Sequence, residues 1–240
     1  NVNFKIIYSN KKIINGECFK TYNLSEGDEI DILATKKSVY GYLAIEGGFN
    51  LEPFCNSVST STRAGIGPNN GKKIGVEDII KFKKESTIDK NFFCSDLYED
   101  SETIRVLKGS QYNYFSKESQ KTFFSKNYKI TNLTDRMGMR LEGPFIKNII
   151  NTNIRSEGIT KGAIQVPANG QPIILLTDYP TIGGYPKIAN VISADYDLLI
   201  QKTPGTNIFF KCIDLDEAEK IYHTRHDNIL KIINNIKEIK

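Results

Sequence analysis

Acidic and basic side chains gather in one short stretch of this chain, residues 134–143, which reads TDRMGMRLEG. Asp135, Arg136, Arg140 and Glu142 lie within eight residues of one another. If the stretch is extended, Arg136, Arg140 and Glu142 share one face, because side chains of a strand repeat every two residues. Such a face suits either an ion-paired wall or a site that binds an anion.

A second candidate anion site is the segment STSTRAGIG at residues 59–67. Its single arginine, Arg63, stands beside small hydroxyl residues and glycines. A guanidinium in flexible surroundings can grip a carboxylate or phosphate with two parallel hydrogen bonds. The spacing GxxxxGK[ST] of a nucleotide-binding P-loop is missing. An exposed arginine in a plain salt bridge fits the same pattern equally well.

Amides and glycines mark the remaining candidate segments, SEG at 156–158, GAIQVP at 162–167, GQP at 170–172 and TDYPTIGGYP at 177–186. Gln165 and Gln171 each offer donors and an acceptor, so they can bind an amide or a lactam. They can equally satisfy backbone groups at the end of a barrel. The paired glycines of the last segment allow close backbone approach, and its polar side chains can supply hydrogen bonds.

Other catalytic constellations are missing from the sequence. The two histidines, His223 and His226, lie in a helical segment without a supporting acid or cysteine cluster, so we expect them to be solvent-exposed. There is no GxSxG elbow and no cysteine–histidine pair near a glycine-rich turn. Any catalysis must therefore depend on carboxylates, arginines, amides and backbone groups.

The composition argues against several classes of binding partner. The 32 basic and 28 acidic residues give a net charge of +4, and the lysines are scattered rather than clustered, which argues against nucleic-acid binding. No apolar run approaches the roughly 20 residues that cross a membrane. Four widely spaced cysteines predict free, mostly buried thiols in a cytoplasmic protein. We expect no metal site.

The elements that must position these residues are mostly short strands. Runs rich in β-branched and aromatic residues predict strands at residues 4–8, 29–33, 39–45, 79–82, 104–107, 128–130, 163–166, 173–176, 191–193 and 208–212. Helices are predicted at residues 116–124, 195–201 and 214–240, the last of them amphipathic. Many strands and few helices indicate a mainly β protein built on closed or partly closed barrels. We expect an N-terminal β subdomain at 1–95, itself incomplete, and a barrel subdomain with the terminal helix at 96–240.

The ordered series LAIEGGF, STRAGIG, TDRMGMRLEG, SEG, GAIQVP, GQPI and TIGGYPKIA, between about residues 42 and 210, closely resembles the biotin-dependent carboxyltransferase-like family. Its members include the C subunit of 5-oxoprolinase (formerly allophanate hydrolase subunit 2), the KipA-type regulator and part of urea carboxylase. The resemblance implies cyclophilin-like β-barrel subdomains. It also implies partnership with 5-oxoprolinase subunits A and B, which together hydrolyse 5-oxoproline to glutamate. ATP would be used at the level of that complex, with no biotin attached to this chain.

The resemblance also implies roles for single residues. Asp135 and Glu142 would be acid/base or orienting groups and Arg136 would act with them, while Arg63 and Arg140 would bind the anionic part of the substrate. Gln165 and Gln171 would bind the amide. The mouth of the pocket would be lined by Thr181, Gly183, Gly184 and Tyr185. Two alternatives remain, a carboxyltransferase component acting on urea or a related small amide, and a KipA-like binding protein without turnover.

Overall fold

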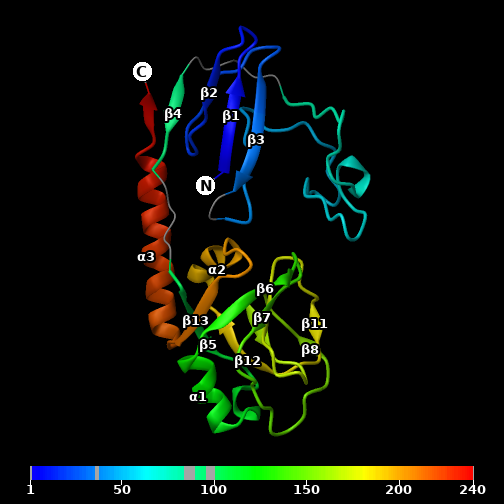
Figure 1. The fold of residues 1–240 in the computed structure, drawn as a ribbon, viewed down its shortest axis with the longest axis vertical. Coiled ribbons are helices and arrows are strands. Elements are labelled where there is room, and N and C mark those ends of the chain that lie inside the picture. Colours follow the sequence, from blue (N-terminus) through cyan, green and yellow to red (C-terminus); the bar gives the residue numbers. More distant parts are fainter. Residues whose placement is uncertain (1, 36–37, 84–89, 96–100, 240) are drawn as a thin grey trace. The chain divides into compact units, whose positions relative to one another are not determined.

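The structure of the chain is a computed structural model that describes residues 2–35, 38–83, 90–95 and 101–239. These fall into two compact units, Asn1–Gly41 with Asn91–Lys240, and Tyr42–Lys90. Strands dominate the first unit, together with helices α1 to α3, so the predicted mainly β class is confirmed (Figure 1). The predicted boundary between residues 95 and 96 stays a prediction.

The larger unit contains a closed barrel of seven strands, in the order β10-β7-β6-β13-β5-β12-β9. Its strands are β5 (Thr103–Lys108), β6 (Tyr128–Thr134), β7 (Gly138–Glu142), β9 (Ala163–Gln165), β10 (Ile173–Leu175), β12 (Lys187–Val191) and β13 (Asn207–Cys212). Neighbouring strands run antiparallel except β13 and β5, which are parallel. Closure leaves the barrel without a free edge for other chains to pair with.

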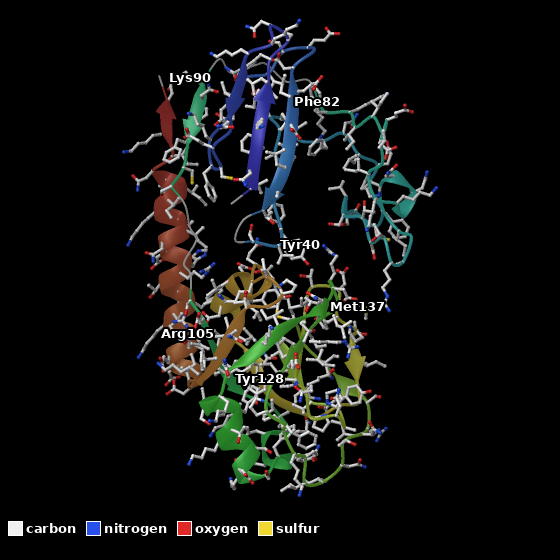
Figure 2. The ribbon with its side chains drawn as sticks, in the orientation of Figure 1. Tyr40, Phe82, Lys90, Arg105, Tyr128 and Met137 are labelled. Atoms are coloured by element: carbon white, nitrogen blue, oxygen red, sulfur yellow. The ribbon has the colours of Figure 1, made fainter. Side chains whose placement is uncertain are left out.

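Alternating side chains fill the barrel with one apolar core. Along β7, Met139 and Leu141 are buried in it, and along β5, Ile104 and Val106 are buried. Tyr128 of β6, labelled in Figure 2, is also fully buried, and burial raises the pKa of its hydroxyl. The period-2 pattern of the sequence therefore gives one inward and one outward face per strand.

Helices α1 (Lys117–Ser125) and α2 (Ser193–Ile200) confirm two of the predicted helices. Ser116 caps α1, because its side chain accepts a hydrogen bond from the Ser119 amide at 3.1 Å. The third helix, α3 (Leu215–Asn234), is capped by Asp214, whose carboxylate accepts from the Glu217 amide at 2.8 Å.

The predicted helix at 214–240 is too long. It ends at Asn234, and β14 (Lys237–Ile239) follows as a strand that pairs with β4 (Asn91–Phe93). The alternating sequence Lys-Glu-Ile suits a strand once a partner is present to take up its backbone hydrogen bonds. That partner lies more than 140 residues earlier in the chain, so local periodicity does not reveal it.

The amino-terminal part of the first unit is a three-stranded sheet of order β2-β1-β3, made of β1 (Val2–Ile7), β2 (Ile13–Asn15) and β3 (Glu29–Thr35). The predicted strands at 39–45 and 79–82 are wrong, since both segments are irregular and Phe82 forms only an isolated bridge to Phe49. Neither run finds a ladder partner in the described residues. The predicted strand at 191–193 lies too late, because β12 ends at Val191 and Ser193 begins α2.

Short turns complete the two units. The second unit consists of turns and isolated bridges around the 3-10 turn η1 (Asn69–Gly71), while η2 (Tyr112–Tyr114) precedes α1. The four cysteines are free, but the expectation that most are buried is wrong, since Cys55 is exposed and the others are half-buried. Within the described residues, no helix has the length and apolar character needed to cross a membrane.

A second, smaller layer covers part of the barrel. It is the two-stranded ribbon of β8 (Glu157–Gly158) and β11 (Ile182–Gly183), which lie side by side at the margin of the barrel (Figure 1). Ile159, Ala163 and Leu175 form a buried cluster there, with Tyr179 packed against it. Ala163 and Leu175 belong to β9 and β10, so this cluster lies on the faces of those strands that turn away from the main core.

Candidate functional site

Four residues form a transverse row across the outside of the barrel. Arg140 of β7 lies opposite Ile173 of β10, and Ile173 lies opposite Gln165 of β9. Gln165 in turn lies opposite Lys187 of β12. Paired residues project from the same face of a sheet. With strands about 4.8 Å apart, this outer row (Arg140, Ile173, Gln165 and Lys187) spans roughly 14 Å.

Exposure changes along the outer row. Met139 and Leu141 point into the core, so Arg140 and Glu142 point outward and are exposed, which places these two on one face as their spacing predicts. Ile164 is buried in the core, so Gln165 also points outward. The Gln165 residue is nevertheless only 5% exposed. An exposed cation, Arg140, is therefore followed along the row by a buried amide, Gln165, and a buried ammonium, Lys187.

Arg136 does not share that face, and the prediction of a three-residue face is wrong for it. It lies in the turn between β6 and β7, next to the Met137 labelled in Figure 2, where the alternation of a strand does not apply. Its Nε and Nη2 donate to Oδ2 and Oδ1 of Asp178 at 2.7 and 2.9 Å. The guanidinium lowers the pKa of the Asp178 carboxyl from its usual value. The pair ties this turn to the segment at 177–186.

Asp135 shapes the same turn. Its Oδ1 accepts hydrogen bonds from the backbone amides of Met137 at 2.8 Å and Gly138 at 3.1 Å. An aspartate that bonds the backbone two residues ahead forms an Asx turn, which favours the reversal between β6 and β7. The carboxylate predicted as catalytic therefore has a clear local structural role.

Gln171 holds the end of the barrel together. Its Oε1 accepts from the Gly143 amide at 2.9 Å, and its Nε2 donates to the Gly143 carbonyl at 3.2 Å. The side chain thereby satisfies both backbone groups of one residue. Of the two glutamines expected to bind an amide, Gln171 binds an amide of the protein itself.

We expect Gln171→Ala to lower the free energy of unfolding by about 1–3 kcal/mol, because two hydrogen bonds are lost and the half-buried backbone groups of Gly143 are left unmatched. Urea unfolding measures this. The variant Gln171→Glu keeps the acceptor but sets a carboxylate oxygen against the Gly143 carbonyl, so it should also lose stability. Unchanged stability in the alanine variant would show that water replaces the side chain.

A cluster of polar side chains lies beneath the β8–β11 ribbon. Lys187 Nζ and Gln111 Nε2 both donate to Oε1 of Glu157, the latter at 2.8 Å. Gln111 Oε1 accepts from the Lys187 amide at 3.2 Å. The Lys187 side chain is 7% exposed and that of Glu157 is 42% exposed. The hydrogen bond from Lys187, then that from Gln111, lowers the pKa of the Glu157 carboxyl. The cluster thus contains an ion pair between a partly exposed carboxylate and a buried ammonium.

Gln165 is the remaining member of this cluster. Its Nε2 is buried and has no hydrogen-bond partner in the described part of the chain. Gly183 of the ribbon lies over it, since a Cβ added there would lie 2.7 Å from that nitrogen and 3.0 Å from Cδ1 of Ile159. Gly183 pairs with Glu157 in the ribbon. Buried polar atoms normally have partners, so this donor is a candidate ligand contact.

The remaining residues expected at the pocket mouth lie around the ribbon. Thr181 and Tyr185 are exposed, and an added Cβ on Gly184 would lie 3.0 Å from the carbonyl oxygen of Ile154. Arg63 is exposed in the turn of the second unit. The structure therefore brings together Gln165 and Gly183 from the predicted set and places Arg140 on the same row.

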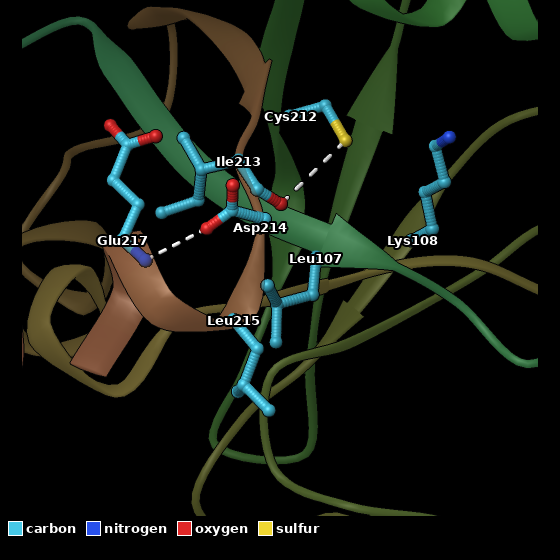
Figure 3. Close-up of a pocket in the computed structure, with 7 residues that line it drawn as sticks. All are labelled: Leu107, Lys108, Cys212, Ile213, Asp214, Leu215 and Glu217. Atoms are coloured by element: carbon cyan, nitrogen blue, oxygen red, sulfur yellow. Dashed lines mark hydrogen bonds between the residues drawn. The ribbon is translucent and has the colours of Figure 1, made fainter.

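Neither of two surface pockets contains a predicted site residue. The first has a volume of about 550 Å³ and lies at the start of α3 (Figure 3). Its lining is Leu107, Lys108, Cys212, Ile213, Asp214, Leu215 and Glu217. Its most prominent carboxylate, that of Asp214, already caps the helix. The second has a volume of about 280 Å³ and lies between Arg105 and the middle of α3.

Sequence reasoning missed Lys187, Glu157 and Gln111 as members of the site. Lys187 lies in the segment TIGGYPKIA, and a lysine entering an otherwise apolar strand is an unusual signal, since lysine is almost never fully buried unless paired. Glu157 lies in the segment SEG, but its partner is 30 residues away. In the described residues, no group of three or more histidine, cysteine, aspartate or glutamate side chains is arranged to hold a metal ion.

Sequence comparisons identify relatives over most of the chain. It is 34% identical over 216 residues to the 5-oxoprolinase C subunit of Haemophilus influenzae, covering 89% of this chain and 70% of the relative. It is 33% identical over 199 residues to the 5-oxoprolinase C subunit of Escherichia coli, covering 82% of this chain and 64% of the relative. The chain thus spans about two thirds of the length of these relatives.

The fold is similar to that of a larger enzyme. The crystal structure of the K. lactis urea amidolyase superposes with a TM-score of 0.80 at 20% identity, covering 95% of this chain and 15% of that protein. Residues 8–212 match the family described as carboxyltransferase domain, subdomain A and B. The ordered motifs, the barrel and these matches agree, and the chain belongs to this carboxyltransferase-domain family.

Proposed function

We propose that this chain is the C subunit of an ATP-dependent 5-oxoprolinase, which works with subunits A and B to hydrolyse 5-oxoproline to glutamate. The similarity to the two bacterial C subunits supports this proposal most directly. The outer row supports it chemically, because its two cations, Arg140 and Lys187, lie on either side of the amide donor of Gln165 on one face. A lactam acid carries a carboxylate and an amide carbonyl, which suit a cation and an amide donor.

The proposal gives this chain a binding and positioning role. Water adds to the lactam carbonyl carbon, the ring C–N bond breaks, and the nitrogen leaves as the amine of glutamate. A donor at the carbonyl oxygen stabilises the negative charge that develops there. ATP is assigned to the complex rather than to this chain, whose sequence contains no GxxxxGK[ST] loop. Its hydrolysis supplies the driving force for ring opening.

The acids and the remaining arginines take secondary roles in this proposal. Glu142 is exposed beside Arg140 and is available as an acid or base, while Asp135 and Arg136 support the turn that leads into β7. Thr181, Gly184 and Tyr185 would border the entrance. Arg63, in the segment 59–67 of the other unit, is proposed as a separate anion-binding residue.

Reconstitution tests the proposal. Glutamate release from 5-oxoproline is measured with this chain and subunits A and B, with ATP present. Turnover that requires all three chains and ATP is the expected result. A stable complex that shows no turnover would contradict it and favour a binding protein of the KipA type.

A carboxyltransferase component acting on urea or a related small amide is the second candidate. The urea amidolyase fold and the 25% identity to the Saccharomyces cerevisiae urea amidolyase over 239 residues favour it. This reaction needs a biotinylated carrier protein. Carboxylation of urea that depends on such a carrier, in the absence of 5-oxoproline turnover, would replace the first proposal with this one.

Arg140→Ala is expected to weaken substrate binding strongly without unfolding the chain, because the side chain is exposed and Met139 and Leu141 still fill the core. A lost charge-assisted contact corresponds to about 1.5–3 kcal/mol, or roughly a 10- to 150-fold weaker affinity. Lys211→Ala, at an exposed cation of β13, is the matched control. Normal turnover in the Arg140 variant, with an unchanged circular dichroism spectrum, would remove Arg140 from the site.

A further inference from the structure

The polar cluster beneath the β8–β11 ribbon contains a donor without an acceptor. Gln165 Nε2 is buried and has no partner in the described residues, although glutamine amides in cores are normally matched. It points toward Gly183, at a place where the addition of one methyl group would produce a clash. A ligand atom can therefore approach this nitrogen closely only because residue 183 is a glycine.

The same cluster contains a carboxylate, that of Glu157, which a ligand carboxylate could replace. Glu157 reaches inward from the ribbon to the buried ammonium of Lys187, and its side chain remains 42% exposed. Lys187 is anchored on the opposite side by its place in β12, directly across from Gln165. Exchange of one carboxylate for another would keep Lys187 paired throughout, so it avoids the large cost of a buried charge without a partner.

We propose that Lys187 and Gln165 bind a small carboxylic acid that carries an amide carbonyl, and that the ligand's carboxylate takes the place of the Glu157 carboxylate on Lys187. The ligand's carbonyl oxygen accepts from Gln165 Nε2. Glu157 is then an internal competitor that occupies the site when the ligand is absent. This inference deepens the proposed function, and it rests on that function for the choice of a lactam acid as the ligand.

The pairing of the two residues suits such a ligand. Lys187 and Gln165 are partners across β12 and β9, next to a register shift between Lys187 and Ala189, so their side chains start from neighbouring positions. In a lactam acid, only the α-carbon and the nitrogen separate the carboxyl carbon from the carbonyl carbon. Ile159, whose Cδ1 would lie 3.0 Å from a Cβ on Gly183, provides an apolar wall for ring methylenes. Gln111 stays bonded to the Lys187 backbone and keeps the strand in place during the exchange.

Gly183→Ala tests the site without changing a charge. Gly183 does not have a positive φ, so alanine adds only its Cβ, which meets Gln165 Nε2 at 2.7 Å. Gly158→Ala is the matched control on the facing strand, because its Cβ would have no neighbour within 4 Å. Titration calorimetry on the full chain with 5-oxoproline is expected to show affinity lower by at least about tenfold in Gly183→Ala and unchanged in Gly158→Ala. Equal affinities in the two variants would overturn the proposal.

Glu157→Ala tests the competition. Removal of the internal carboxylate is expected to strengthen 5-oxoproline binding by about tenfold relative to the unmodified chain, since the ligand no longer displaces a hydrogen-bonded partner. If this variant proves unstable, Glu157→Gln is used instead, because it keeps an acceptor for Lys187. Affinity that falls in both variants, or stays the same, would overturn the role of Glu157 as a competitor.

Two further probes separate this inference from the proposed function. Binding of N-acetylglycine, an open-chain amido acid, that is sensitive to Gly183→Ala would support the site even if the complex does not turn over 5-oxoproline. Full turnover of 5-oxoproline by the complex containing Gly183→Ala would overturn the site while leaving the proposed function intact. Binding of 2-pyrrolidinone, which lacks the carboxylate, with the same affinity as 5-oxoproline would overturn the role of Lys187.

Discussion

Replacement of Asp195 by alanine is expected to lower the free energy of unfolding by about 3 kcal/mol, because a buried carboxylate loses its charge-assisted hydrogen bonds to the backbone and to the partly exposed guanidinium of Arg105. Asp195 is 2% exposed. Its Oδ2 accepts from the backbone amide of Arg105 at 2.7 Å and from Nε of the same residue at 2.9 Å. The carboxylate therefore fixes α2 to β5 through both the backbone and the side chain of Arg105.

The same helix provides the control. Asp197 is two residues away, its side chain is 71% exposed, and it lies 4.0 Å from Arg225. Exposed pairs of this kind contribute at most about 1 kcal/mol, so Asp197→Ala should be close to neutral. Urea unfolding of both variants measures the difference. Equal small losses of stability in the two variants would mean that water solvates the Arg105 guanidinium as well as the Asp195 carboxylate does.

Replacement of Phe123 by alanine is expected to lower the free energy of unfolding by about 3–5 kcal/mol. Phe123 is fully buried, and its ring stacks on that of Phe210 with centroids 4.6 Å apart. The ring of Tyr128 lies 5.7 Å away. Deletion of the Phe123 ring removes apolar contacts between α1 and β13 and leaves a cavity that rigid barrel strands fill poorly.

Phe124 is the matched control for this aromatic cluster. It is the next residue of α1 and is only partly buried against the core, so Phe124→Ala should cost less, about 1–2 kcal/mol. Thermal unfolding followed by circular dichroism measures both variants. A similar loss in the two would indicate that α1 contributes through its helix rather than through the ring of Phe123.

Several features of the fold could be predicted because they depend on neighbouring residues alone. Met139 and Leu141 alternate with Arg140 and Glu142, and this pattern correctly predicts one buried and one exposed face. Ser116, followed by a helical pattern, correctly predicts the start of α1. The ordered glycine and proline motifs correctly indicate the family. Each signal is local, so it can be read along the sequence.

Predictions that need a distant partner failed. The residues at 39–45 have the composition of a strand, but a strand requires a neighbour for its backbone groups and finds none in the described part of the chain. Lys237–Ile239 has the composition of a helix end, but it pairs with β4 instead. Tertiary contacts decided both outcomes.

The candidate site shows the same division. The sequence by itself determined the mainly β class, the family and the candidate side chains Arg140 and Gln165. Only the tertiary structure decided that Arg136 pairs with Asp178, and that Gln165 lies opposite Lys187 beneath Gly183. The physical reason is that strand register joins residues far apart in the chain, and register follows from how the whole barrel closes rather than from local side-chain preferences.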